Sequence, residues 1–140
     1  MKISHYPFII LLALLSACAT TPVKPDATSD PKKSPETVLI TYHVKPGKEA
    51  DLEDVLRRGW EIYRQEHLVF AQPHLIVRDK EDGDKTRVVE VFTWVSHSAP
   101  DHAPASVKGI WNEMHALCEP RGGHGGLEGG EVEIIGPKKW

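Results

Sequence analysis

The fold is decided by the stretch VLITYHVKPG at residues 38–47. Its first seven residues are rich in β-branched and aromatic side chains, which predicts a strand, and Pro46-Gly47 ends that strand. A helix is expected just after Gly47, because acidic residues occupy its early turns and arginines its later ones, as the helix dipole favours. Its buried face is predicted from apolar residues and one glycine at helical spacing: Leu52, Val55, Leu56, Gly59, Ile62 and Tyr63.

The rest of the chain supplies three strands and a second helix. Residues 68–78 form a predicted strand that is broken near Pro73, a polar hairpin turn covers 79–85, and a third strand covers 87–95. The second helix is expected between the loop 96–104 and Glu119. Its apolar stripe consists of Val107, Ile110, Trp111, Met114, Leu117 and Cys118. The glycine-rich segment 121–130 is expected to be a loose linker, and residues 131–135 are expected to form the last strand.

This order of strand, helix, strand, strand, helix and strand predicts an α+β domain of the ferredoxin-like βαββαβ type. Such a domain has an antiparallel four-stranded sheet with two helices on one face. The first and third strands are apolar on both sides, and strands of that kind need both faces covered. Because two helices cover only one face, we expect a second copy of the chain to cover the other, and therefore a homodimer.

Three segments together resemble a known superfamily: Val44–Glu49 at the end of the first strand, Val91–Trp94 at the end of the third, and the second helix with its aromatic residue. They are similar to the dimeric α+β barrel proteins, in particular those like antibiotic biosynthesis monooxygenases, over about residues 38–135. The resemblance implies that sheets from two subunits pack face to face. It also implies a pocket between the sheet and the helices of each subunit.

The N-terminus has the parts of a targeting signal. Lys2 precedes the apolar run Phe8–Leu15, and small residues lead to Cys18. A cysteine at that point resembles a bacterial lipoprotein signal, which implies lipidation of Cys18 and removal of residues 1–17. Since position 19 is Ala rather than Asp, the resemblance implies an outer-membrane protein that faces the periplasm. An ordinary signal peptide and an uncleaved anchor are the alternatives, although the run is far shorter than the roughly 20 apolar residues that span a bilayer.

The remaining sequence divides into a tether and a domain. Residues 18–36 are expected to be disordered, because they are rich in Thr, Pro, Lys and Asp and hold too little apolar surface to fold. Residues 37–140 have the length of one small domain. The chain has 17 basic and 20 acidic residues and a net charge of −3, and no basic stripe of the kind that binds nucleic acid. We therefore expect no nucleic-acid partner. The membrane attachment through Cys18 is what the resemblance to a lipoprotein signal implies.

Glu90 is the first candidate for chemistry. It lies in phase with Phe92 and Trp94 on a strand expected to be covered on both sides, so its carboxyl group needs a partner or a raised pKa. A carboxylate tuned in this way can act as a catalytic general base. The alternative is a structural glutamate bonded to an arginine, a histidine or a backbone amide.

The second candidate is an apolar pocket lined by Trp94, Trp111 and Met114, with His115 as a catalytic partner of Glu90. Trp111 and His115 are four residues apart and share a helix flank. The alternative is that the tryptophan and methionine are core residues that His115 merely flanks. Haem-degrading relatives of the superfamily use an Asn on the first strand, which residues 38–44 lack, so we expect no cofactor.

The scattered histidines and cysteines predict no further site. His97 and His102 bracket one loop, but no pair of histidines or cysteines stands at the tight spacing of a zinc motif, so we expect no metal. Cys118 has no partner in its own chain if Cys18 is lipidated. Its place on the helical stripe predicts a buried and unreactive thiol.

The sequence supports two hypotheses of function. In the first, the chain is an envelope lipoprotein whose domain binds a small apolar ligand or a partner protein. In the second, it is a cofactor-independent, monooxygenase-like oxidoreductase that acts on a small aromatic or quinol-type substrate. The second hypothesis needs a cavity of about 300 Å³, the size at which ligand pockets begin.

Overall fold

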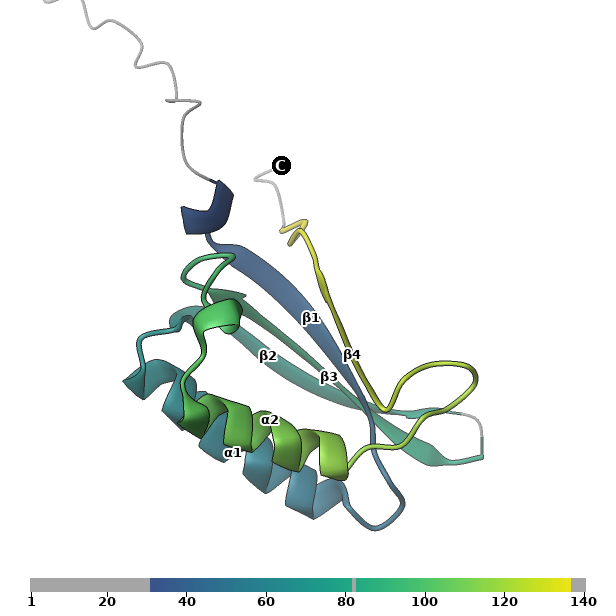
Figure 1. Cartoon of the computed structure of the whole chain (residues 1–140). Helices are drawn as coiled ribbons and strands as arrows, with labels where there is room; N and C mark the ends of the chain where they lie inside the picture. The colour runs from purple at the N-terminus through teal and green to yellow at the C-terminus, as the bar shows by residue number, and fades with distance from the viewer. Residues whose placement is uncertain (1–30, 82, 137–140) are drawn as a thin grey trace, which may run out of the picture.

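A computed structural model describes residues 31–81 and 83–136 and shows the strands and helices in the predicted order (Figure 1). The elements are η1 (Pro31–Lys33), β1 (Glu36–His43), α1 (Glu49–Gln65), β2 (Val69–Glu81), β3 (Lys85–Trp94), η2 (Pro100–His102), α2 (Ala105–Ala116) and β4 (Leu127–Glu131). The predicted signal peptide, Cys18 and most of the tether lie outside the described residues. Within the described part of the chain, no helix is long and apolar enough to cross a membrane.

The sheet has four antiparallel strands in the order β2-β3-β1-β4. Both long helices lie on one face of it (Figure 1). The predicted ferredoxin-like α+β fold is therefore confirmed. The first strand of the chain occupies a central place in the sheet, where β3 pairs with it on one side and β4 on the other.

The two helices pack against the sheet and against each other. α1 buries Leu52, Val55, Leu56, Gly59 and Tyr63, whereas Ile62 is only partly buried. α2 buries Val107, Ile110 and Met114, and Trp111 is partly buried. Gly59 lies at the helix contact, because a Cβ there would come within 2.9 Å of Ile110 Cγ2 and 3.0 Å of Met114 Cε. A larger residue at this position would therefore force the Ile110 and Met114 side chains to move.

The last strand is not where the sequence predicted it. β4 covers Leu127–Glu131, inside the expected linker, and only Glu131 of the expected strand 131–135 belongs to it. Gly129 lies opposite Ile40, and a Cβ on Gly129 would come within 2.6 Å of Ile40 Cδ1. The prediction was wrong because it relied on the low β propensity of glycine, whereas residues 127–131 pair with β1 despite Gly129 and Gly130.

The segment between α2 and β4 is also more ordered than expected. The Arg121 side chain is almost fully buried, and its guanidinium forms ion pairs with Glu81 and Glu119. The same group donates hydrogen bonds to the carbonyl oxygens of Val44 and Thr86. These contacts fix the segment over one corner of the sheet.

The hairpin between β2 and β3 is tighter than the predicted turn 79–85. β2 continues to Glu81 and β3 begins at Lys85, and the opposite charges of Asp79 and Arg87 pair across the two strands. This cross-strand ion pair stabilises the polar end of the β2–β3 hairpin, so both strands extend further than the sequence predicted. The predicted break near Pro73 is present as a register shift between Val69 and His74.

The face of the sheet away from the helices is open and apolar. Leu75 is 56% exposed and Val77 is 48% exposed. Their cross-strand partners Val91 and Val89 are half-buried, as is Leu39 on β1. This is the face that we expect a second copy of the chain to cover, and the homodimer itself stays a prediction.

Candidate functional site

Glu90 lies at the centre of the sheet, on the face covered by the helices. Its side chain is buried, and the residue is 1% exposed, as the phase with Phe92 and Trp94 predicted. The hydroxyl group of Tyr42 donates a hydrogen bond to Glu90 Oε2 at 2.8 Å. His74 Nε2 lies 3.0 Å from Glu90 Oε1. The carboxyl group is therefore bound on both oxygens, by one side chain from β1 and one from β2.

His74 is held in place by the helix above it. Its ring stacks on Trp60 of α1, with ring centroids 3.6 Å apart and an angle of 13° between the planes. Stacking fixes the orientation of the imidazole, and with it the hydrogen bond to Glu90. The sequence analysis missed this partner, because the register shift in β2 hides the alignment of His74 with β3.

Tyr42 is a proton donor in this arrangement. Burial, followed by the negative charge of Glu90, raises the pKa of the Tyr42 hydroxyl well above its usual value. Its oxygen also lies 3.8 Å from Met114 Sδ on α2. The hydroxyl thus stays protonated and connects the buried carboxylate to the space between the sheet and the helices.

That space contains a pocket of about 220 Å³. Its lining is almost entirely apolar and aromatic and consists of Ile40, Tyr42, Tyr63, Phe92, Trp94, Pro100, Trp111, Met114 and Leu127. The three residues predicted to line a pocket, Trp94, Trp111 and Met114, all lie in this wall. The indole N–H of Trp111 donates to the hydroxyl oxygen of Tyr63 at 2.7 Å, and burial raises the pKa of Tyr63.

The structure does not bring His115 together with Glu90. His115 is exposed on α2 and lies outside the pocket wall. The helix turns Val107, Ile110 and Met114 toward the sheet, and the next residue after Met114 is rotated by about 100° away from them. Sharing a flank with Trp111 is therefore not enough to place His115 in the pocket.

Cys118 is buried, as predicted. Burial raises the pKa of its thiol to about 11, so the reactive thiolate is scarce at neutral pH. This agrees with an unreactive structural thiol.

Comparisons with known proteins agree with the fold. SnoaB from Streptomyces nogalater, a cofactor-independent oxygenase, superimposes with a TM-score of 0.56 at 20% identity, over 75% of this chain and 99% of that one. An antibiotic biosynthesis monooxygenase gives a TM-score of 0.53 at 18% identity, over 71% and 97% of the two chains. A conserved protein from Methanosarcina mazei gives 0.55 at 13% identity, over 72% and 93%.

At such identities the likeness establishes the shared fold. No protein-family model matches the sequence, and no curated protein matches it either. The chemistry must therefore be argued from the residues of this chain.

Proposed function

We propose that this chain is an envelope lipoprotein whose domain binds a small aromatic ligand in the pocket between sheet and helices. The observation that carries the proposal is the apolar pocket of about 220 Å³, whose lining includes Tyr42 and Tyr63. An apolar cavity of about 150 Å³ is enough to bind benzene. The volume therefore suits a monocyclic ligand, although it is below the roughly 300 Å³ at which ligand pockets usually begin.

The two hydroxyls narrow the ligand class further. Tyr42 gives its hydrogen to Glu90, so its oxygen is left to accept a hydrogen bond from a ligand hydroxyl. Tyr63 accepts the indole hydrogen of Trp111, so its own hydrogen is left for donation to a ligand oxygen. A phenol or quinol satisfies both groups within an aromatic wall.

Calorimetric titration with p-cresol tests the ligand site. We expect binding to the wild type, and loss of binding in Leu127→Trp, which fills the pocket. Leu39→Trp is the matched control, because Leu39 belongs to the opposite face of the sheet. Equal binding by the wild type and Leu127→Trp would place the ligand elsewhere. The absence of binding at millimolar concentrations of p-cresol, phenol and hydroquinone would contradict the proposal.

The membrane attachment rests on the sequence Leu15-Ser16-Ala17-Cys18. In this proposal, lipidated Cys18 holds the domain at the outer membrane, facing the periplasm. Cell fractionation of Cys18→Ser tests it: we expect the variant to be soluble in the periplasm. Retention of that variant in the membrane fraction would refute the lipid anchor.

A second candidate function is a cofactor-independent oxygenase. It is favoured by one observation, the link from the pocket through Tyr42 to the buried Glu90. A quinol hydroxyl can pass its proton to the Tyr42 oxygen while the Tyr42 proton moves to Glu90 Oε2, and the resulting quinolate is then open to oxidation by O₂. The pocket of about 220 Å³ is smaller than the cavity of about 300 Å³ that this function was expected to need, which counts against the candidate.

Oxygen consumption in the presence of a quinol separates the two functions. The oxygenase requires turnover that Glu90→Gln abolishes while p-cresol binding persists. The catalytic role first expected of His115 is untested. Because His115 is exposed and lies outside the pocket wall, we now expect unchanged turnover in His115→Ala. If the wild type binds ligand but consumes no oxygen, only the binding function stands.

A further inference from the structure

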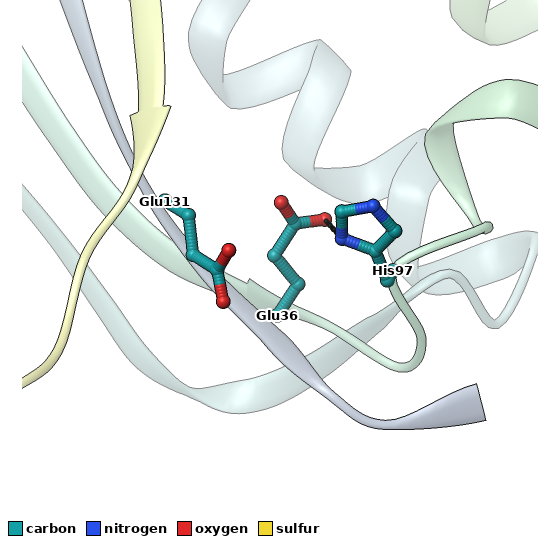
Figure 2. Close-up of side chains that lie close together, drawn as sticks. All are labelled: Glu36, His97 and Glu131. Atoms are coloured by element: carbon teal, nitrogen blue, oxygen red, sulfur yellow. Dashed lines mark ion pairs between the residues drawn. The ribbon is translucent and has the colours of Figure 1, made fainter. Parts of the chain in front are cut away.

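A second group of polar side chains lies at the end of the sheet where β1 begins. It consists of Glu36 at the start of β1, His97 in the loop after β3, and Glu131 at the end of β4. One ligand-type atom from each residue lies within 4.8 Å of the other two. Figure 2 shows the Glu36 carboxylate between the Glu131 carboxylate and the His97 ring. His97 Nδ1 is 3.2 Å from Glu36 Oε2.

Backbone hydrogen bonds hold the three segments in place. The amide of His97 donates to the carbonyl of Ser34 at 2.9 Å, which ties the loop to the entrance of β1. Glu131 lies opposite Val38 in the ladder, and the next amide, that of Val132, donates to the Thr37 carbonyl at 2.9 Å. These backbone hydrogen bonds fix the positions of the three residues relative to one another, although His97 lies in a loop.

The charges of this group are unbalanced. The Glu36 and Glu131 carboxylates lie on neighbouring strands and on the same face of the sheet, diagonal to each other in the ladder, and like charges this close repel each other. Among the described residues, the ion pairs at these two carboxylates comprise only the contact of Glu36 with His97. The Glu36 side chain is 12% exposed, so water screens it poorly. A cation beside both carboxylates would remove this repulsion.

We propose that Glu36, His97 and Glu131 bind a divalent first-row transition metal ion, with Zn²⁺ as the test case. Two carboxylates and an imidazole provide three ligands, and an adjoining hollow of about 450 Å³ has room for water in the remaining positions. The imidazole selects such a metal over Ca²⁺ and Mg²⁺, which prefer oxygen ligands. Lys32 also lines the hollow, so its positive charge would oppose a metal ion bound there.

The geometry needs only a small adjustment. Bonds of about 2.0–2.2 Å from zinc to nitrogen and oxygen hold the ligand atoms about 3–4 Å apart. Because Glu131 is exposed at the end of its strand, rotation of its side chain closes the site without movement of the sheet. The sequence analysis expected no metal because it sought ligands at short spacings, whereas these three lie far apart in the chain.

Calorimetric titration of the full chain, purified in detergent without a histidine tag, tests the proposal. We expect one Zn²⁺ per chain and a zinc-dependent rise in melting temperature. His97→Ala and Glu131→Gln should each weaken binding by at least about tenfold, a loss that even a missing outer-sphere partner produces. Matched controls are His102→Ala, from the same loop, and Glu61→Gln, from the exposed side of α1. Both controls should bind as the wild type does.

Three results would overturn the proposal. They are no zinc binding by the wild type, equal zinc affinity in wild type and His97→Ala, and Ca²⁺ affinity equal to that for Zn²⁺. The last result would mean that the two glutamates only attract cations in general. Circular dichroism of each variant without metal separates a lost ligand from a lost fold.

Discussion

The two faces of the sheet are built from the same strands, but among the described residues the candidate site around Glu90 lies on one of them. On the covered face, Glu90 is surrounded by core residues, and each of its oxygens has a fixed partner. On the open face, Leu75 and Val77 are apolar yet exposed. Burial gives a polar group defined partners. A buried carboxyl group must form hydrogen bonds with protein groups, whereas an exposed one forms them with water.

The largest difference between the faces should appear in leucine truncation. Leu52 is fully buried under the helices, and Leu52→Ala should cost about 2–5 kcal/mol of unfolding free energy. Leu75→Ala on the open face should change it by no more than about 0.5 kcal/mol. Urea unfolding at low protein concentration measures both. Equal costs would mean that the open face is buried within a single chain.

The next largest loss of unfolding free energy is expected from replacing the buried Glu90. Glu90→Gln keeps the shape but alters the partners of Tyr42 and His74, and we expect a loss of about 1–3 kcal/mol. Glu53→Gln is the control, since its ion pair with Arg78 is exposed and such pairs contribute about 0–1 kcal/mol. A Glu90→Gln protein as stable as the control would show that the network does not support the fold.

The open face is tested by a charge placed within it. Val77→Lys should weaken self-association by at least about tenfold, because the new charge would be buried between the two sheets of a dimer. Light scattering coupled to size-exclusion chromatography measures the mass of each species. Glu61→Lys on the outer side of α1 is the control. A wild type that is monomeric at micromolar concentration would refute the homodimer.

The smallest effect on stability is expected at Glu81, in the corner of the open face where Arg121 pairs with it. Burial opposes ionisation of Glu81, but hydrogen bonds from His43 and Arg121 outweigh it and lower the pKa of Glu81. A carboxyl group whose pKa is lower in the folded state stabilises the protein at pH values above its pKa in the unfolded chain, which is about 4.3 for glutamate. That stabilisation is lost as the pH falls through the pKa of the folded state. Unfolding of wild type and Glu81→Gln should therefore differ most above pH 5 and converge in acid. A difference independent of pH would exclude ionisation as the cause.

Sequence periodicity predicted the parts of the molecule that depend on local pattern. The alternation of side chains along β3 predicted that Glu90 is buried, and the helical spacing of apolar residues predicted that Met114 and Cys118 lie in the core. It did not predict what depends on register between distant strands. The register shift in β2 brings His74 beside Glu90, and the pairing of residues 127–131 with β1 makes Gly129 part of a strand.

The position of β4 beside β1 has a consequence for biosynthesis. β1 pairs with β4, the last strand of the described residues, so the sheet is incomplete until residues 127–131 have been translated. Contacts between such distant segments also close slowly, because the chain entropy of a long loop must be lost first. For the envelope lipoprotein that we propose, this delay would favour export, because the chain stays unfolded until β4 has been synthesised.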